Sequence, residues 1–387
     1  MRPIAELVGN EEEFPVLRNW VFLNHAGVCP LPRVAAEALR TYAQQAEAAG
    51  YLGAAWYLEL EKLRQETAAL INAHRDEIAF VKNTSEGLSI VARGIDWQWG
   101  DRIVTTNVEY PANVYPWMDL VHTRAVKLVM AEEVEDNGVR RVPTEKIIEA
   151  ASHPRTRMVS LSHVQFASGQ RMDVEAIGKF CRERAILFCV DAIQTMGILP
   201  VDVKGMNIDY LAADGHKWLL GPEGAGVFYC RKELQEHTRP LMVGWLNVVN
   251  AMEYGSYDYT LKPDAGRFEC GTYNVAGLLA LRASMGLIRS VGVEAVRARI
   301  KHLTDDLAAG LAGRGFRVVS PRGEGEWSGS VCFVLPGQDH SRIVSDLRKQ
   351  YRMEIALREG RLRASPHFYN TEQQIDALIA ALPQHVE

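Results

Sequence analysis

A single lysine, Lys217, stands where an apolar run gives way to a turn rich in glycine and proline. The segment is IDYLAADGHKWLLGPEGAG, residues 208–226. Its apolar run is typical of a buried strand, and the glycines that follow allow backbone to pass close to a ligand. An amine at such a strand end, with His216 beside it, suits Schiff-base chemistry. The alternative interpretation is a solvated lysine at a strand end.

An acidic residue ends a second apolar run. In AILFCVDAIQ, residues 185–194, Asp191 follows the run and Gln194 stands three positions later. A carboxylate at the end of a buried strand is costly without a cation, and a protonated pyridine nitrogen is a cation that could pair with it. The segment therefore indicates a pyridine-type cofactor, unless Asp191 only caps the next helix.

A third segment has the pattern of a phosphate-binding turn. EIAFVKNTSEGLSIVARGI, residues 77–95, begins as a strand, passes through Thr84 and Ser85, and continues as an amphipathic helix. Free N–H groups at the start of such a helix and two hydroxyl groups favour binding of an anion. The same residues could instead form a capping box. With Asp191 and Lys217, however, the turn stands in the chain order that pyridoxal phosphate requires.

These segments resemble the class V aminotransferase family of fold-type I pyridoxal phosphate enzymes. The family includes cysteine desulfurases, selenocysteine lyase, kynureninase and isopenicillin N epimerase-like proteins. The similarity runs through nearly the whole chain, from FLNHAGVCPLP at 22–32 to SPHFYNTEQQID at 365–376. It implies an α/β fold, pyridoxal 5'-phosphate as the cofactor and a small amino acid as the substrate.

The resemblance implies a role for each residue of the cofactor motifs. Lys217 would form the aldimine with the cofactor and later move the α-proton of the substrate. His216 would contact the phosphate, together with the hydroxyl groups of the turn. Asp191 would pair with the pyridinium, and Gln194 would bond the phenolic oxygen.

Two positions near the cofactor depart from the family pattern. Asp214 stands where the family usually has a serine, and an acid beside a phosphate is unfavourable, so we expect it to orient His216 or to point away. Tyr110, in NVEYPANVYPW at 107–117, stands where a histidine commonly stacks on the cofactor. A phenol ring still offers a face for stacking, but it is a poor proton shuttle near neutral pH. A core tyrosine before a proline turn is the alternative.

The resemblance also indicates residues on the substrate side. Arg363, in RLRASPHFYN, matches the arginine that holds the α-carboxylate through its planar fork. Its basic neighbours, Arg358 and Arg361, are expected to be solvated. Gln165 lies in SLSHVQFASGQRMD, which is similar to a kynureninase segment, and it would contact cofactor or substrate unless it is a satisfied polar side chain. His25 is a further candidate unless it is a cap.

The motif RFECGTYN, residues 267–274, resembles a family loop whose threonine reaches the phosphate of the neighbouring subunit. Thr272 would take that role here, which implies a homodimer as the functional unit. Tyr273 replaces the usual proline, so the loop is less restricted in φ and presents an additional aromatic ring to the site.

The catalytic cysteine of the most similar desulfurases and selenocysteine lyases has no counterpart here. In those enzymes it lies on a loop shortly before the carboxylate-binding arginine, and YRMEIALREGRLR, residues 351–363, contains no cysteine. Cys29 and Cys270 flank possible site segments, and four other cysteines lie in apolar runs typical of core thiols: Cys181, Cys189, Cys230 and Cys332. Persulfide transfer is therefore disfavoured.

Apolar runs that favour strands alternate with helical stretches such as Glu175–Arg184. The alternation predicts a mainly parallel sheet with helices on both faces and ligands at the carboxyl ends of strands, and the resemblance adds a seven-stranded type of sheet. We expect a large pyridoxal phosphate-binding domain at 17–288 and a smaller α/β domain formed by 1–16 and 289–387. The strand-like runs lie at 101–106, 125–131, 156–166, 185–191 and 208–213.

Composition limits the classes of function. The 387 residues, 47% of them hydrophobic, are enough for two lobes with a sizeable core. The net charge is -5, and the charged residues form no long runs of one sign, so the sequence does not indicate a surface that binds nucleic acid. The chain has neither an apolar signal core nor a run of about 18 apolar residues that would span a membrane. A cytoplasmic enzyme without a metal site is the expectation.

The sequence and the resemblance together predict a pyridoxal phosphate enzyme, with aminotransferase as the main prediction. A β-lyase, acting by carbon–sulfur or kynureninase-like cleavage, and an amino-acid epimerase are alternatives, because all begin with loss of the same proton. A non-catalytic module that only binds the cofactor is an alternative of another class. Four residues argue against it: Lys217, Asp191, Gln194 and Arg363.

Overall fold

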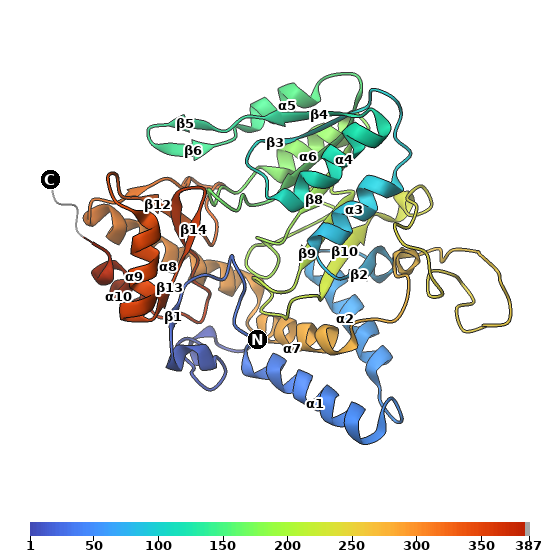
Figure 1. Ribbon diagram of the computed structural model, residues 1–387, viewed down its shortest axis with the longest axis horizontal. Coiled ribbons are helices and arrows are strands. Elements are labelled where there is room, and N and C mark those ends of the chain that lie inside the picture. The colour runs from blue at the N-terminus through green and yellow to red at the C-terminus, as the bar shows by residue number, and fades with distance from the viewer. Residues whose placement is uncertain (384–387) are drawn as a thin grey trace.

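A seven-stranded sheet forms the centre of the larger part of the protein in a computed structural model that describes residues 1–383 (Figure 1). Strands β3, β4, β7, β8 and β9 run parallel, whereas β10 runs antiparallel to β2 and β9. The mainly parallel sheet predicted from the sequence is confirmed. In spatial order the strands are β2 (Ile78–Val81), β10 (Gly226–Cys230), β9 (Tyr210–Asp214), β8 (Leu187–Asp191), β7 (Thr156–Ser162), β3 (Arg102–Thr106) and β4 (Lys127–Ala131).

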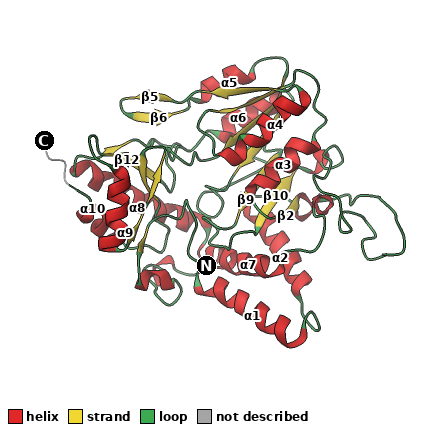
Figure 2. Ribbon diagram, in the orientation of Figure 1, coloured by secondary structure: helices red, strands yellow, loops and turns green. Residues whose placement is uncertain are grey.

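Alternate residues of these strands face two separate apolar cores. In β8, Phe188 and Val190 belong to one core and Cys189 to the other, as the two-residue period of a strand requires. Figure 2 shows helices on both sides of the sheet. One core takes side chains from α2 (Trp56–Leu70), α5 (Thr144–Ala151), α6 (Val174–Glu183) and α7 (Val275–Val291); the other takes them from α3 (Thr84–Gly94) and α4 (Tyr115–Arg124). Helix α1 (Arg33–Ala49) packs along α7.

Polar side chains start several of these helices. Asn83 accepts a hydrogen bond from the backbone N–H of Glu86 at 2.9 Å, at the start of α3. Asp173 caps α6 in the same way through Ala176 at 3.0 Å. Each cap satisfies one of the N–H groups that a helix leaves free in its first turn, so the strand-to-helix turns are fixed by their own sequence.

A second, antiparallel sheet lies in the C-terminal part of the chain (Figure 1). Strands β14 and β15 are joined by a two-residue turn, Glu359–Gly360, in which both residues have positive φ, 47° and 72°. Turns of this kind match the twist of a tight hairpin. The sheet contains β11 (Arg317–Val318), β12 (Val331–Val334), β15 (Arg361–Ala364) and β14 (Ala356–Arg358), and it shares a core with α8 (Val293–Gly313), α9 (His340–Tyr351) and α10 (Glu372–Ala381).

The N-terminal segment packs against this C-terminal part. Strand β1 (Val21–Phe22) pairs in parallel with β13 (Met353–Glu354), and the Phe14 ring stacks on Tyr369 with centroids 3.8 Å apart. The predicted domain boundaries stay a prediction. They assign β1 to the large domain, 17–288, but the strand with which β1 pairs lies outside that range. A short hairpin of β5 (Val134–Asp136) and β6 (Val139–Arg141) stands at the other side of the C-terminal part.

No single helix within residues 1–383 has both the length and the apolar composition to cross a membrane. Helices α7 and α8 reach that composition only as a pair, and they meet at an angle of 81°.

Candidate active site

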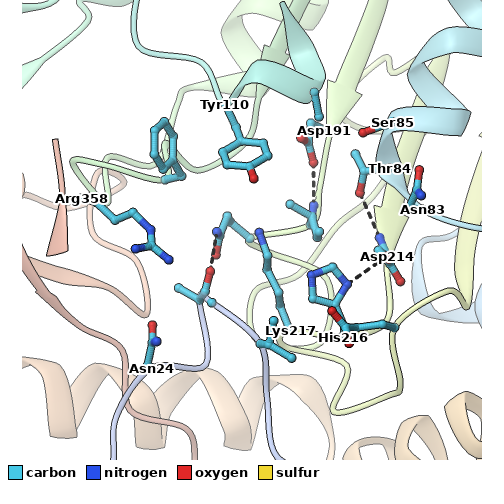
Figure 3. A pocket seen from close by; sticks show the side chains of 18 of the residues that line it. Asn24, Asn83, Thr84, Ser85, Tyr110, Asp191, Asp214, His216, Lys217 and Arg358 are labelled. Atoms are coloured by element: carbon cyan, nitrogen blue, oxygen red, sulfur yellow. Dashed lines mark hydrogen bonds and ion pairs between the residues drawn. The ribbon is translucent and has the colours of Figure 1, made fainter. Parts of the chain in front are cut away.

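A cavity of about 700 Å³ lies at the carboxyl ends of β8 and β9, between the two sheets. Parallel strands deliver their last residues to one edge of a sheet, which is where ligands of such folds bind. The cavity brings together most of the residues predicted from the sequence, but not His25, Gln165 or Thr272. The predicted residues that line it are Thr84, Ser85, Tyr110, Asp191, Gln194, His216, Lys217 and Arg363. All of them except Gln194 and Arg363 are labelled in Figure 3.

Lys217 and Asp191 form the charged centre of the cavity. Burial lowers the pKa of Lys217 to about 8, although the negative charge of Asp191 opposes this shift. Asp191 is 2% exposed, and burial raises its pKa to about 7 in spite of a hydrogen bond from the backbone N–H of Ile193 at 3.0 Å. The lowered pKa gives Lys217 a larger neutral, nucleophilic fraction near neutral pH than an ordinary lysine has, and the buried carboxylate of Asp191 is suited to a further cationic partner.

The start of α3 supplies hydrogen-bond donors on one side of the cavity. Thr84 and Ser85 are its first two residues, and the N–H groups of a first helical turn are not used by the helix itself. The Thr84 side-chain oxygen accepts a hydrogen bond from the backbone N–H of Asp214 at 3.1 Å, which leaves its own O–H free to donate. Donors at the positive end of a helix dipole are suited to a phosphate group.

His216 lies beside the same end of α3, held by an acid (Figure 3). Its Nδ1 atom is 2.9 Å from a carboxylate oxygen of Asp214, a close charge contact whose angle departs from that of an aligned hydrogen bond. The other Asp214 oxygen accepts the backbone N–H of Gly215 at 2.7 Å. Asp214 thus orients His216, as the charge argument from the sequence predicts, and the other ring nitrogen of His216 remains available to a ligand.

Tyr110 and Gln194 line the space above and beside the lysine. The Tyr110 ring centroid is 5.6 Å from Lys217 Nζ, and the side chain is 48% exposed, so its face is open to a planar ligand. Gln194 accepts a hydrogen bond from Trp218 Nε1 at 2.8 Å and donates to the Ala26 carbonyl at 3.1 Å. This fixes the amide and leaves one of its N–H groups for a further acceptor.

Arg363 is the most deeply buried cation of the cavity. It is 1% exposed and donates to the Phe166 carbonyl at 2.7 Å and, at 3.4 Å, to Asn24. Its Nε has no partner within the described residues, and burial lowers its pKa to about 10. A buried guanidinium with unused donors and no ion-pair partner within residues 1–383 is suited to a carboxylate ligand.

The prediction that the neighbours of Arg363 are solvated is wrong for Arg361, which is buried, whereas Arg358 is partly exposed. Arg361 is 6% exposed and forms an ion pair with Glu133 at 2.9 Å. Arg358 lines the cavity and donates to the Leu357 carbonyl at 2.8 Å. Arg361 is buried because its face of the β14–β15 hairpin packs against the larger part of the protein, where Glu133 and the Ala167 carbonyl meet its guanidinium.

His25 and Gln165 do not reach the cavity. His25 is fully buried, with Nε2 2.6 Å from the Tyr369 hydroxyl and Nδ1 2.9 Å from the Ser365 carbonyl, and burial lowers its pKa to about 4. Gln165 donates to Glu109 at 2.7 Å behind the cavity wall. The predicted substrate contacts of both residues are therefore not supported, and the neighbouring Asn24 and Phe166 line the cavity instead.

Glu109 is a residue that the sequence analysis did not single out. It is 7% exposed, and burial raises the pKa of its carboxyl group. The carboxylate accepts hydrogen bonds from Ser162, through both its backbone N–H at 2.9 Å and its hydroxyl, and from Asn113 and Gln165. It fastens the turn that carries Tyr110 to the end of β7. An acid directly before a tyrosine-proline turn was the available signal.

Thr272 lies outside the cavity of its own chain. It is exposed and, with Cys270, lines a separate surface hollow near the start of α3 that also includes Lys82 and Glu86. The predicted contact with a neighbouring subunit stays a prediction.

None of the described residues that line the cavity is a cysteine. Cys29 is 7% exposed, its thiol points to the Gly221 carbonyl at 3.5 Å, and burial raises its pKa. A protonated, buried thiol of this kind is a poor nucleophile.

The cavity fits pyridoxal phosphate on three separate observations. The hydrogen-bond donors at the start of α3, the buried carboxylate of Asp191 and the amine of Lys217, whose pKa burial lowers, match the phosphate, the ring nitrogen and the aldehyde of the cofactor. Tyr110 supplies a face against which the ring would lie.

Comparison with known proteins agrees with this chemistry. The family model for aminotransferase class-V matches residues 21–378. A probable cysteine desulfurase from Methanothermobacter thermautotrophicus is 31% identical, over 95% of this chain and 94% of the relative. The structure of cysteine desulfurase from Thermococcus onnurineus superposes with a TM-score of 0.88 at 26% identity, covering 98% of this chain and 97% of that one.

A second solved structure is a mutant of C-DES with glycine covalently linked to its pyridoxal phosphate cofactor. It has a TM-score of 0.87 and 25% identity, covering 96% of this chain and 98% of that chain. C-DES has also been solved in complex with its reaction product cysteine persulfide, where it is named a cystine C-S lyase. The resemblance found in the sequence is confirmed. The chain belongs to the aminotransferase class-V family of pyridoxal phosphate-dependent enzymes.

Proposed function

We propose that the protein is a lyase that breaks the carbon–sulfur bond of a cysteine-derived amino acid. The observation that carries this proposal is a cavity lined by a buried arginine, Arg363, and by Lys217, but by no cysteine among its described residues. The relatives named as cysteine desulfurases and the cystine C-S lyase support sulfur chemistry more than transamination. The alternative prediction, a β-lyase, is thus better supported than the aminotransferase.

No cysteine is found among the described residues that line the cavity, and this distinguishes two kinds of sulfur chemistry. A desulfurase needs an enzyme cysteine to accept the sulfur atom, and Cys29 is buried with its thiol turned to Gly221. Without an acceptor, sulfur leaves together with the group to which it is attached. A substrate in which sulfur carries a further substituent, such as a disulfide or thioether of cysteine, therefore suits this cavity better than free cysteine.

The charged residues of the cavity and the start of α3 have different tasks in such an elimination. Arg363 binds the α-carboxylate through its unused guanidinium donors and so fixes the direction of the α-hydrogen. Lys217 accepts the α-proton at Nζ, for which a lowered pKa is required. The carboxylate of Asp191 would stabilise positive charge on the ring nitrogen of the cofactor. The start of α3 and His216 would hold the phosphate.

Bound pyridoxal phosphate would supply the electron sink for the pair left by the α-proton. The carbon–sulfur bond then breaks with both electrons on sulfur, which takes up a proton and leaves as a thiol or persulfide. One water molecule is consumed, and pyruvate and ammonium are the other products. No external oxidant or reductant is needed.

A substrate panel separates the possible reactions of the holoenzyme. Cystine, cysteine, alanine and aspartate are incubated singly, and pyruvate, sulfide, persulfide and keto acids are measured by mass spectrometry. We expect pyruvate and cysteine persulfide from cystine. Keto acids formed together with pyridoxamine phosphate would instead identify an aminotransferase. Sulfide from cysteine that depends on Cys29 or Cys270 would identify a desulfurase.

We also propose a homodimer as the functional unit. A loop between β10 and α7 projects from the body of the protein (Figure 1), and it exposes large apolar side chains that include Met252, Tyr254 and Tyr257. Exposed apolar groups of this size mark interaction surfaces. Thr272 lies near the base of this loop, outside its own cavity. Mixing inactive Lys217→Ala and Thr272→Ala chains tests whether Thr272 acts in the cavity of the neighbouring subunit. If it does, a mixed dimer has one cavity with both residues intact, and activity is partly recovered. If each cavity uses the Thr272 of its own chain, no activity is recovered.

A further inference from the structure

Three arginines lie on one face of the β14–β15 hairpin. Residues opposite each other in an antiparallel pair share a face, and the register pairs Arg358 with Arg361 and Ala356 with Arg363. Leu357 and Leu362 form the intervening pair and pack in the core of the C-terminal part. The side of the hairpin that is turned to the seven-stranded sheet is therefore cationic along its length.

These three arginines differ in their partners. Arg361 is neutralised by Glu133. Arg363 has backbone and amide partners and is the arginine assigned to the α-carboxylate. Arg358 is only partly buried, and within residues 1–383 no carboxylate lies within ion-pair distance of it; its one hydrogen bond goes to the Leu357 carbonyl. Its guanidinium thus keeps most of its five donors for a ligand.

Arg358 faces the cavity on the side opposite to the phosphate donors. Figure 3 shows it across the cavity from Asn83 and Thr84, with Lys217 between them. Arg358 lines the same cavity as Lys217 and Arg363, so its guanidinium lies on the side of the reacting centre. A ligand group that meets Arg358 therefore belongs to the substrate and not to the phosphate end of the cofactor.

The acidic residues that line the cavity do not neutralise Arg358. Glu354 is held by Arg348 through two contacts of 2.7 Å, and Asp214 is held by Gly215 and His216. Asp191 faces Lys217 at the end of β8. The exposed Glu223 makes no ion pair with Arg358. The substrate side of the cavity thus has two guanidinium groups available for anions, one more than the α-carboxylate requires.

We propose that Arg358 binds a second anionic group, carried by the sulfur substituent of the substrate. This rests on the proposed lyase function and narrows it to cysteine derivatives whose leaving thiol bears a carboxylate. Arg363 would hold the carboxylate next to the scissile bond, and Arg358 would hold the one on the departing side. The two guanidinium groups share one rigid hairpin face, so they select the spacing between two carboxylates as well as their charge.

A matched pair of substrates tests the charge alone. S-carboxymethylcysteine and S-carbamoylmethylcysteine have nearly the same shape, but only the first carries a second carboxylate. With the holoenzyme we expect kcat/KM, followed as pyruvate release, to be roughly ten- to a hundredfold higher for the acid, the range of one charge-assisted contact. In Arg358→Gln this ratio should fall to about one.

A binding measurement keeps the proposal testable if neither compound is turned over. The ligand is 3-(carboxymethylthio)propanoic acid, which lacks the amino group and cannot react, together with its monoamide at the carboxymethyl end. Calorimetry with the holoenzyme should give tighter binding of the diacid than of the monoamide, with the difference lost in Arg358→Gln. No turnover with this binding pattern intact would reject the lyase function but retain the anion site.

Two results would overturn the assignment of Arg358. Equal binding of diacid and monoamide by the wild type would show that no second anion is recognised. Equal weakening of both by Arg358→Gln would show that Arg358 and Arg363 hold the same carboxylate. Arg342→Ala is the control for loss of a charge, because this arginine of α9 is 81% exposed. Its unchanged ratio, and similar melting temperatures of all variants, exclude a general effect.

Discussion

The side-chain oxygen of Thr84 accepts a hydrogen bond from the backbone N–H of Asp214 at 3.1 Å, and this bond joins the start of α3 to the end of β9. It connects the phosphate end of the cavity directly to the strand that precedes Lys217. One threonine therefore has two tasks, since its oxygen fixes the strand end and its O–H is left for the ligand.

Thr84→Val should weaken binding of pyridoxal phosphate more than Ser85→Ala does. The valine removes a donor to the phosphate and also leaves the buried N–H of Asp214 without a partner, a loss of about 1 to 3 kcal/mol. Ser85 is exposed and loses only a donor. Dissociation constants of the cofactor, obtained by equilibrium dialysis, check the order. Equal effects would mean that the link to Asp214 has no part in binding.

Reduction of the holoenzyme with borohydride should attach the cofactor to Lys217 alone. The amine lies in the cavity beside Asp191, and burial favours its neutral, nucleophilic form. Peptide mass spectrometry identifies the modified lysine. Lys217→Ala should bind the cofactor without this attachment and should fail to exchange the α-hydrogen of a substrate for deuterium. Label on another lysine would contradict the assignment.

Capture of pyridoxal phosphate by the apoenzyme should accelerate as the pH rises towards about 8 and level off above it. The neutral amine is the reactive form, and the pKa of Lys217 is lowered from 10.5 to about 8. Asp191 raises the pKa of Lys217, so Asp191→Asn should move the midpoint to lower pH. Stopped-flow absorbance gives the rate at each pH. A rate that still climbs at pH 10 would indicate an unperturbed lysine.

Asp191→Asn should reduce turnover by roughly 10²–10³-fold while the cofactor stays bound, because an amide cannot stabilise positive charge on the ring nitrogen. The phosphate contacts at α3 are unaffected by this change. Asp209→Asn is a matched control, as Asp209 is also buried but pairs with Arg231 outside the cavity. It should lower the free energy of unfolding with little selective loss of kcat. Full activity of the Asp191 variant would show that this residue only caps the following backbone turn and has no part in catalysis.

Cys29→Ser and Cys270→Ser should each retain most of the activity. The Cys29 thiol donates to the Gly221 carbonyl, a contact that a serine hydroxyl can also make, and Cys270 lies outside the cavity. Pyruvate and sulfur products from cystine are measured for both variants against wild type. Selective loss of sulfur release in either variant would restore the desulfurase as the favoured function.

The strand ends were predictable from the sequence, because a charged residue that closes an apolar run is costly to bury unless a partner or ligand meets it there. Asp191 ends β8 and Lys217 follows β9, as the runs 185–191 and 208–213 indicated. The helical stretch expected at Glu175–Arg184 is α6, Val174–Glu183. Tight turns and caps are local features, and for this reason the sequence locates them well.

Side-chain direction was less predictable than position along the chain. The segments of His25 and Gln165 do border the cavity, but in each case an adjacent residue, Asn24 or Phe166, faces it. A one-residue difference decides which face a side chain takes, and an irregular segment has no period from which to read it. Glu109 and Arg358 depend on contacts between distant parts of the chain, which no local pattern encodes.

The alternation in the β14–β15 hairpin also makes the protein sensitive to an error in folding. A slip of one residue between these strands would turn one of them over and so exchange either Leu357 or Leu362 with the arginines beside it. The cavity would lose cationic groups, and the core of the C-terminal part would receive uncompensated charge. The misaligned hairpin would therefore be less stable than the correct one and would also lack part of the site. The turn at Glu359 and Gly360, with both φ angles positive, is the local element that sets the correct alignment before the two sheets meet.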